Sequence, residues 1–183
     1  MRITGGILKG QQLKVPKSKL RPTTDRAREA VFSILTSLAR RWTRGLDLFA
    51  GTGALGIEAL SRGLEWVDFV DQDHRCCAII EQNLKKVGFA GKAHVYCCAI
   101  IKALTFLTNE YDIIFIDPPY ANHNMNDIMI QLAQSNLVGN NSTVIAFHSS
   151  RTSPQQKYNS LSLIKNKKYG DTAISIYCKE TIS

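Results

Sequence analysis

The 183-residue sequence has no apolar run near the roughly 18 residues that a membrane-spanning helix requires. Residues 1–9 lack the apolar stretch of a secretory signal peptide, so we expect a cytoplasmic protein with no membrane partner. Repetitive or strongly Pro-, Gly- or Ser-biased segments are also missing, which argues against extensive disorder. With 44% hydrophobic residues, the chain can bury one substantial core.

Signatures of metal sites and disulfides are missing as well. The five cysteines form two adjacent pairs and one single residue, without zinc-knuckle spacing, and their odd number makes a poor disulfide framework. The four histidines show no metal-ligand spacing. We therefore expect no metal site. We also expect the cysteines to be reduced, small buried side chains in a reducing compartment. No cysteine lies beside a proline, which argues against covalent C5-cytosine methylation.

Acidic residues are scarce in the first 44 positions. This segment holds two acidic residues and eleven lysines and arginines, which gives a net charge of +9. The remaining residues carry twelve basic and thirteen acidic side chains, for a net charge of −1. Such segregation is expected of a protein that binds a polyanion, and a merely solvated basic face would not concentrate it. We therefore predict that the N-terminal quarter binds nucleic acid.

Strand and helix patterns alternate from residue 45 onward. Short, nearly continuous apolar runs predict buried strands at 45–49, 66–70, 94–98, 113–116 and 143–147, with helices at 53–62, 74–87, 100–108 and 125–135. Runs at 160–165 and 172–179 predict a terminal antiparallel pair. Residues 2–4 and 12–15 predict a hairpin, and an amphipathic helix follows the caps around Thr24. The chain therefore predicts a Rossmann-like α/β sheet at 45–183 with a basic β-hairpin and helix extension at 1–44.

A glycine-rich turn, Gly51-Thr52-Gly53-Ala54-Leu55-Gly56, follows the first predicted strand of the sheet. Gly51 and Gly53 let the backbone approach a ligand, and the next helix begins with free N–H groups. Asp71, twenty residues after Gly51, ends the second strand, where a carboxylate can accept bonds from ribose hydroxyls. Asp47 suits a cationic ligand end, such as a methionine ammonium, better than a pyrophosphate. This favours an adenosine cofactor with a methionine moiety over NAD, although the glycine pattern alone serves both.

The second motif is Asp117-Pro118-Pro119-Tyr120, directly after an apolar strand. The lone pair of an aromatic amine is delocalised into its ring. Hydrogen bonds to the Asp117 carboxylate and the Pro118 carbonyl would return density to the nitrogen, and Pro119 helps to fix that carbonyl. Tyr120 would stack on a flipped base. The two motifs together predict methyl transfer to an exocyclic amine of a nucleobase.

With these residues in view, the chain resembles the RsmD family of bacterial 16S ribosomal RNA guanine-N2 methyltransferases. The likeness covers nearly the whole length, and its most distinctive block is the run from Arg21-Pro22-Thr23-Thr24-Asp25 to Ala30. The glycine turn, the Asp117–Tyr120 block and the closing Tyr169-Gly170-Asp171-Thr172 match as well. The glycine and proline blocks occur in many methylase families, whereas the Arg-Pro-Thr block is the one that indicates this family.

This resemblance implies a seven-stranded class I methyltransferase sheet and S-adenosylmethionine as methyl donor. The expected cofactor contacts are Asp47, Phe49, Ala50, Gly51, Thr52, Gly53, Asp71, Gln72, Ala99 and Ile100. The expected RNA contacts are Arg2, Lys9, Lys14, Arg21, Thr23, Arg26 and Arg28. The expected substrate is a guanine of 16S rRNA, within a small-subunit assembly particle, and the expected protein is a monomer. Deleting residues 1–20 should remove most of the salt dependence of RNA binding and leave cofactor binding intact.

Two positions depart from the family pattern. Ala99 stands where an acidic residue usually receives the adenine amine, and Phe147 stands where a glutamate usually follows the fifth strand. The first departure predicts weaker cofactor binding and keeps open a non-catalytic RNA-binding assembly factor. Adenine-N6 methylation of DNA or RNA also stays open, because the Asp117–Tyr120 motif would serve either amine. An NAD oxidoreductase is a third alternative, although Asp47 and the basic N-terminal quarter disfavour it.

Overall fold

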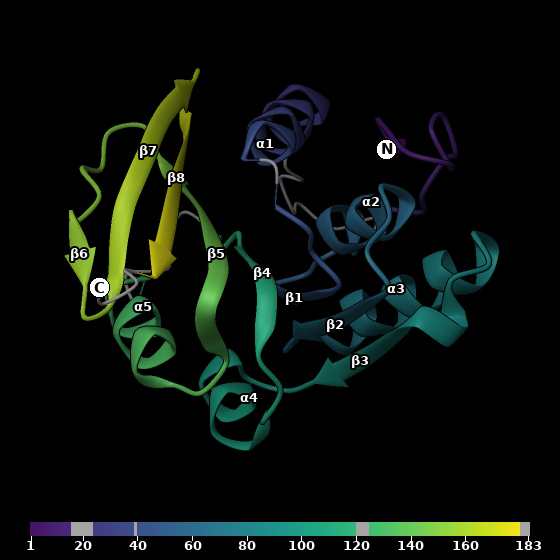
Figure 1. The fold of residues 1–183 in the computed structure, drawn as a ribbon. Coiled ribbons are helices and arrows are strands. Elements are labelled where there is room, and N and C mark those ends of the chain that lie inside the picture. The colour runs from purple at the N-terminus through teal and green to yellow at the C-terminus, as the bar shows by residue number, and fades with distance from the viewer. Residues whose placement is uncertain (16–23, 39, 120–124, 180–183) are drawn as a thin grey trace.

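The structure is a computed structural model that describes residues 1–15, 24–38, 40–119 and 125–179. Eight strands form one sheet in the order β3-β2-β1-β4-β5-β8-β7-β6 (Figure 1). The strands are β1 (Arg44–Leu48), β2 (Trp66–Asp71), β3 (Ala93–Cys97), β4 (Tyr111–Ile116), β5 (Val138–Ser149), β6 (Lys157–Tyr158), β7 (Leu161–Tyr169) and β8 (Thr172–Lys179). The helices are α1 (Asp25–Ser37), α2 (Ala54–Ser61), α3 (His74–Lys86), α4 (Ile100–Phe106) and α5 (Met125–Gln134), with the short 3₁₀ turn η1 (Ala90–Lys92).

The strands β3, β2, β1, β4 and β5 run parallel, while β8, β7 and β6 continue the sheet in antiparallel pairs. Leu48, near the end of β1, pairs with Val70 of β2 and with Ile116 of β4. The loops that follow these three strands therefore leave the same edge of the sheet side by side. This edge is where open α/β sheets bind their ligands.

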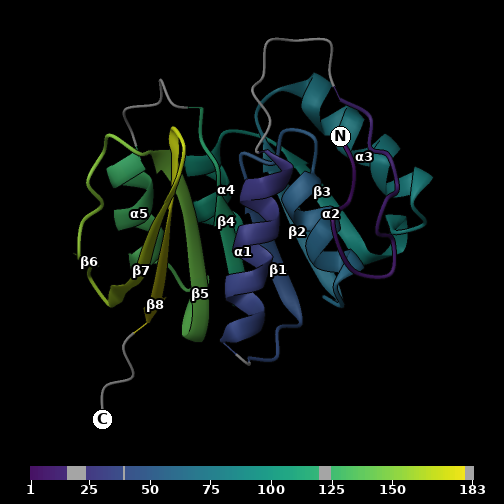
Figure 2. The ribbon, with the colours of Figure 1, turned by 90° about the horizontal axis from the view of Figure 1, so that it is seen from above.

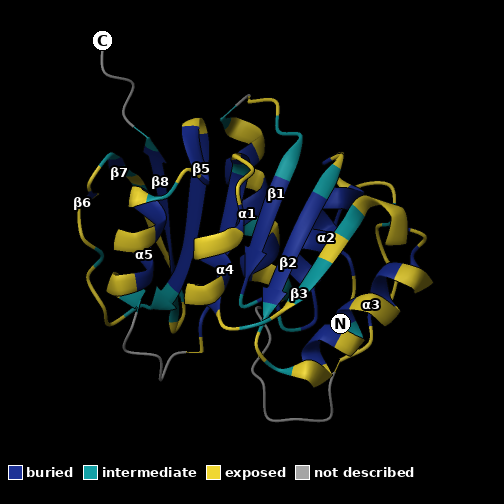
Figure 3. Cartoon of the chain, turned by 90° about the horizontal axis from the view of Figure 1, so that it is seen from below, coloured by how far each residue is buried: buried dark blue, intermediate teal, exposed yellow. Residues whose placement is uncertain are grey.

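Helices cover both faces of the sheet (Figures 1 and 2). Successive residues of β4 show the division: Ile113 and Phe115 pack in the core beneath α1, α2 and α3, whereas Ile114 and Ile116 pack in the core beneath α4 and α5. A central strand buried on both faces has to be apolar throughout, which explains its continuous apolar sequence. The burial colouring in Figure 3 shows the central strands almost entirely buried.

The N-terminal segment joins the same core. A single bridge between Arg2 and Gln12 closes the predicted hairpin, and Ile3 and Leu13 are buried with the residues of α1 and α2. Thr24 caps α1, since its side chain accepts a hydrogen bond from the N–H of Ala27. The hairpin and α1 are thus packed onto the sheet. Their role as an RNA-binding extension stays a prediction.

The α/β class and the parallel sheet are as the sequence predicts, with two differences in detail. The sheet has eight strands in place of seven, because the two-residue β6 pairs with the start of β7. Strand β5 runs from Val138 to Ser149, well beyond the predicted 143–147, because Val138 pairs with Tyr111 of β4 at its start and β8 continues the pairing to Ser149 at its end. Within the described residues, no helix is long and apolar enough to cross a bilayer.

Candidate active site

The glycine turn leaves the end of β1 with a backbone that few side chains tolerate. Gly51 has φ = 56° and Gly53 has φ = 74°, in the left-handed region that favours glycine. The turn is closed by a hydrogen bond of 2.7 Å from the Gly53 N–H to the Ala50 carbonyl. A Cβ on Gly51 would meet only the Phe49 carbonyl oxygen, at 3.9 Å, so open space lies beyond this residue. The turn therefore presents bare backbone to that space.

Asp71 holds the turn in place. One carboxylate oxygen accepts a 2.8 Å hydrogen bond from the Gly51 N–H, and the other accepts a 2.9 Å bond from the Asp73 N–H. A carboxylate offers about four acceptor positions, so Asp71 retains capacity for a ligand hydroxyl. Asp71 thus fixes the turn, a role that the spacing of twenty residues did not predict, while its contact with the cofactor stays a prediction.

Asp47 lies beneath the turn and is only 1% exposed. Its Oδ2 accepts a 2.9 Å hydrogen bond from the Gly56 N–H, while among the described residues its buried Oδ1 has no partner. Burial raises the pKa of Asp47 well above its ordinary value, and the nearby charges of Asp117 and Asp71 raise that pKa further. A buried carboxylate in this state is stabilised by a cation or a hydrogen-bond donor close by.

Asp117 follows β4 at the same edge. Its backbone N–H lies 3.5 Å from the Leu48 carbonyl oxygen, so the Asp-Pro-Pro segment leaves the sheet directly beside the glycine turn. Its side chain is half-buried and lies close enough to Asp47 to disfavour a second negative charge there. Pro118 is buried and Pro119 exposed. The two motifs therefore meet in one place, as the sequence predicts, although Tyr120 lies outside the described residues.

The residues at this edge fit a cationic adenosine cofactor. The three neighbouring carboxylates of Asp47, Asp71 and Asp117 suit a positively charged group, and the orphaned Oδ1 of Asp47 suits a donor. The N-cap residue of α2, Gly53, makes no side-chain hydrogen bond, and in the first turn of this helix the Gly56 N–H is bonded to Asp47. A pyrophosphate, in contrast, would bring two negative charges to three carboxylates.

The remaining predicted cofactor contacts include few polar side chains. Ala99 is exposed and caps α4 without a side-chain hydrogen bond, so it offers no acceptor for an amine. Ile100 is buried and can supply an apolar wall, while Gln72 is exposed beside Asp71. Phe49 is half-buried and Ala50 buried. These five residues remain predicted cofactor contacts, as does Thr52.

The N-terminal hairpin supports the glycine turn from outside. The Asn83 side chain in α3 donates hydrogen bonds of 3.0 Å to the Thr52 carbonyl and 3.1 Å to the Lys14 carbonyl. The Thr52 hydroxyl lies 3.8 Å from the sulfur of Met1. Removing residues 1–20 would take away these supports together with buried core residues. The contacts indicate that such a deletion would also disturb the glycine turn, while its effect on cofactor binding stays a prediction.

The predicted RNA contacts divide into two groups. Arg2, Lys9, Lys14 and Arg26 are exposed, which leaves their charges available to phosphates. Arg28 is 0% exposed, and its guanidinium donates to the Arg2 carbonyl and pairs with Asp25 and Glu58. Its assignment as an RNA contact is therefore wrong, because a fully buried side chain cannot reach a phosphate.

Two further predicted contacts, Arg21 and Thr23, lie outside the described residues. No group of three or more His, Cys, Asp or Glu side chains within the described ranges could hold a metal ion.

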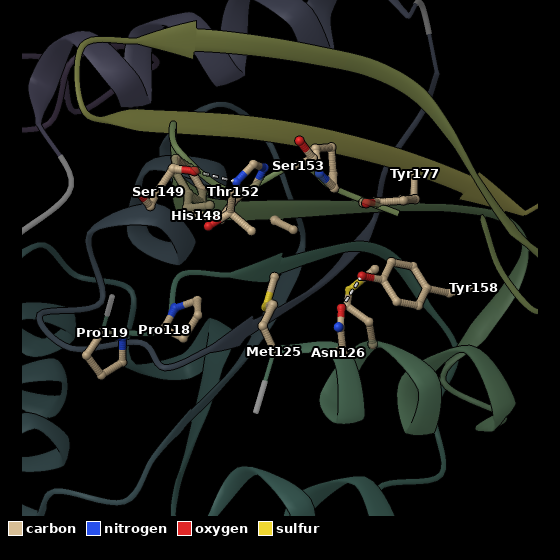
Figure 4. A pocket seen from close by; sticks show the side chains of 14 residues that line it. Pro118, Pro119, Met125, Asn126, His148, Ser149, Thr152, Ser153, Tyr158 and Tyr177 are labelled. Atoms are coloured by element: carbon tan, nitrogen blue, oxygen red, sulfur yellow. Dashed lines mark hydrogen bonds between the residues drawn. The ribbon is translucent and has the colours of Figure 1, made fainter. Parts of the chain in front are cut away.

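A pocket of about 230 Å³ opens next to Pro118 and Pro119 on the side of β5 and α5 (Figure 4). Its lining includes His148 and Ser149 from the end of β5, Asn126 from α5, and Tyr158 and Tyr177 from the antiparallel strands. This pocket could not be predicted from the strand and helix pattern of the sequence, because its residues come from four separate elements. One feature of the sequence could have indicated the pocket: polar and aromatic residues interrupt strands and a helix start that are otherwise apolar.

Phe147 does not follow the fifth strand. It lies inside β5 opposite Ile174 and is 0% exposed in the core. A glutamate at this position would need a buried partner, so Phe147 is a packing residue in this fold. From β5 the pocket lining takes Ala146 and Phe147 as well as His148 and Ser149.

Comparison with known proteins points to one family. Residues 1–178 match a family described as conserved hypothetical protein 95, Cons_hypoth95. A Bacillus subtilis (strain 168) protein named "Putative rRNA methyltransferase YlbH" is 33% identical over 183 residues, which cover 98% of this chain and 99% of that protein. The Escherichia coli (strain K12) protein named "Ribosomal RNA small subunit methyltransferase D" is 39% identical over 121 residues, covering 66% of this chain and 60% of that protein.

A solved structure has the same fold over nearly the whole chain. The structure named "Putative methyltransferase yhhF from Escherichia coli" superposes with a TM-score of 0.88 at 28% identity, covering 99% of this chain and 98% of that one.

Proposed function

Because the chain belongs to the Cons_hypoth95 family, that of the small-subunit rRNA methyltransferase D proteins, we propose that it methylates the exocyclic N2 amine of a guanine in 16S rRNA. S-adenosylmethionine is its cofactor and supplies an electrophilic methyl group. One observation carries the proposal: the Asp117-Pro118 segment leaves β4 directly beside the glycine turn of β1, with its carboxylate close to that of Asp47.

This arrangement supports a division of labour among the carboxylates. Asp47 and Asp71, with the glycine turn between them, hold the cofactor end of the site. Asp117 accepts one N–H of the target amine and the Pro118 carbonyl accepts the other, which returns lone-pair density to the nitrogen. After transfer the amine nitrogen carries an extra proton, and Asp117 is placed to receive it. Catalysis then depends on alignment and electrostatics, without a covalent enzyme intermediate.

The basic N-terminal surface supports RNA as the substrate. Arg2, Lys9, Lys14 and Arg26 expose cations on one packed segment, suited to successive phosphates. The same proposal includes action in the cytoplasm, as a monomer, on rRNA within a small-subunit assembly particle.

Base-resolved methylation tests the proposal. Purified protein and labelled S-adenosylmethionine would be incubated with naked 16S rRNA, with small-subunit particles and with DNA, and the products digested and identified by mass spectrometry. We expect N2-methylguanosine from one or both ribosomal substrates. N6-methyladenosine as the product would replace the guanine assignment. Binding of rRNA without any methylated product would favour an assembly factor.

A further inference from the structure

The pocket beside Pro118 has the dimensions and walls of a site for one planar base. Its volume of about 230 Å³ is below the roughly 300 Å³ at which pockets for drug-sized ligands begin. Met125 and the rings of His148 and Tyr177 line the pocket, and these surfaces suit the face of an aromatic ring (Figure 4). Met129 belongs to the lining as well. Pro118 forms part of the lining, so the pocket continues directly from the catalytic segment.

One polar side chain in this lining has a fixed orientation. The Tyr158 hydroxyl donates a 2.7 Å hydrogen bond to Oδ1 of Asn126 (Figure 4). This bond occupies the amide oxygen, and within the described part of the chain no hydrogen bond occupies the Nδ2 group. Tyr158 is itself 5% exposed and packs edge-on against Tyr177, with ring centroids 5.5 Å apart, so its hydroxyl has a set position. With its oxygen bonded to Tyr158, the exposed Asn126 amide has its Nδ2 group available as a donor beside the pocket.

The histidine in the lining does not compete for the same role. One ring nitrogen of His148 lies 2.9 Å from the Ser149 carbonyl oxygen and the other lies 2.8 Å from the Ser175 hydroxyl. Burial lowers the pKa of His148, so the ring is neutral at physiological pH. With both nitrogens occupied, His148 contributes a flat neutral wall.

We infer that this pocket receives the far edge of the target guanine, and that the Nδ2 group of Asn126, oriented by Tyr158, donates a hydrogen bond to guanine O6. The inference rests on the proposed function, because it takes the N2 amine to lie at Asp117. Guanine carries its N2 amine on one edge and its O6 and N7 acceptors on the opposite edge. A guanine whose amine is held at Asp117 thus directs its acceptors away from the catalytic carboxylate and into the adjoining pocket.

The same donor selects against adenine. Adenine in this orientation has no amine to offer Asp117, and it places its own N6 donor where guanine has O6. Two donors would then face each other with neither satisfied, and a site built around a hydrogen bond discriminates strongly against a base that cannot form it. Asn126 and Tyr158 are accordingly specificity-determining residues.

The test compares two target bases across matched variants. The RNA is a fragment carrying the guanine that the wild-type protein modifies, and a second fragment carries 2-aminopurine at that position, which keeps the N2 amine and lacks O6. Single-turnover rates with labelled S-adenosylmethionine are measured for the wild type, Asn126→Ala, Tyr158→Phe and Gln131→Ala. Gln131 is exposed on the same helix and does not line the pocket, so Gln131→Ala is the control.

We expect the wild type to favour guanine by about tenfold, the worth of one well-placed hydrogen bond. Asn126→Ala should slow methylation of the guanine fragment about tenfold and leave the rate with the 2-aminopurine fragment unchanged. Tyr158→Phe should reduce the preference for guanine part-way. Gln131→Ala should leave that preference as it is in the wild type. An Asn126→Ala protein that keeps the wild-type preference, or slows both bases equally, overturns the inference. A wild type that methylates no guanine at N2 would instead refute the proposed function.

Discussion

At the residue scale, the proposed chemistry depends on Asp117 as the acceptor of a hydrogen bond from the target amine. We expect Asp117→Ala to slow methyl transfer about 100-fold, comparable to losing one preorganised hydrogen-bond partner of a reacting group. Asp117→Asn should retain more activity, because its amide oxygen can still accept an N–H. Single-turnover methylation measures both variants, with cofactor affinity by calorimetry as the control. Equal losses in the two variants would count against hydrogen-bond acceptance as the role of Asp117.

Asp47 links the cofactor site to the stability of the empty protein. Because its pKa is raised in the fold, its contribution to stability is full below pH 3.8 and declines as the pH rises toward that raised value. Asp47→Asn removes this titration. We expect the free energy of unfolding of the wild type to fall relative to the variant by up to about 1.4 kcal/mol for each pH unit in that window. Urea titrations of both proteins from pH 4 to pH 8 measure the difference, and parallel curves would contradict the expectation.

Gly56 shows a different constraint in the same motif. A Cβ at this position would lie 2.3 Å from the ring of Phe69, whereas a Cβ on Gly91 would meet nothing within 4 Å. We expect Gly56→Ala to lower the free energy of unfolding by about 1–3 kcal/mol through overpacking. Gly91→Ala, whose backbone is outside the left-handed region, serves as the control and should change stability by less than about 0.5 kcal/mol. Chemical denaturation of both variants tests the comparison.

These residues also show how far the sequence could predict the site. The glycine turn, Asp71 and Asp117 follow strand ends, and parallel strands bring their ends together, so local pattern was sufficient. Asn126 and Tyr158 are 32 positions apart, on a helix and on a two-residue strand, and only the pairing of β6 with β7 brings them into contact. Arg28 was misassigned because charge alone does not show that a buried Glu58 lies opposite it.

At the scale of elements, the N-terminal hairpin, α1 and α2 are joined by one buried ion cluster. Glu58 of α2 accepts hydrogen bonds from the Thr4 N–H and hydroxyl and from Arg62, and it pairs with Arg28 of α1. Glu58 and Arg28 are both 0% exposed. This cluster places the basic segment on the sheet.

Breaking that cluster should affect stability and leave electrostatic RNA contacts largely in place. We expect Arg28→Ala to lower the free energy of unfolding by about 1–3 kcal/mol, because it removes one of the two arginine partners of the buried Glu58 and the donor to the Arg2 carbonyl. Arg26→Ala, two positions away and exposed, should change stability by less than about 0.5 kcal/mol. It should instead reduce the slope of log affinity against log salt by about 0.7–0.9. Thermal denaturation and filter binding separate the two effects, and a large stability loss in Arg26→Ala would contradict the assignment.

The helices and parallel strands were predictable because their apolar period matches their geometry. The length of β5 was not, since Gly139, Asn140 and Asn141 discourage a strand, and pairing with β4 and β8 extends it regardless. The N-terminal segment reads as a separate extension because its charge differs from the rest. Its apolar side chains, such as Ile3 and Leu13, are nevertheless buried in the common core.

At the scale of the whole molecule, the positive charge lies at both ends of the described sequence. Residues 45–150 hold six basic and eleven acidic side chains, whereas residues 151–179 hold six basic residues and only Asp171. Exposed Lys167 and Lys168 lie on β7, next to the strand that supplies Tyr177 to the pocket. The sequence totals had merged these two opposite segments into a charge of −1.

We expect the double variant Lys167→Glu/Lys168→Glu to weaken RNA binding and lower its salt slope by about 1.4–1.8 if both lysines neutralise phosphates. Binding of S-adenosylmethionine should be unchanged, because neither lysine lies at the glycine turn. Filter binding at several salt concentrations and calorimetry measure the two properties. An unchanged slope would mean that these lysines only protect the edge of the sheet against aggregation.

Strand β8 lies between β5 and β7 although it follows both along the chain. During synthesis on the ribosome, β5 must therefore wait with one side unpaired until residues 172–179 have emerged. Tyr177 arrives with them, so the nascent protein acquires a wall of its base pocket in the same event that closes its sheet. A truncated product that stops before β8 would lack this wall of the pocket and would leave one edge of β5 unpaired.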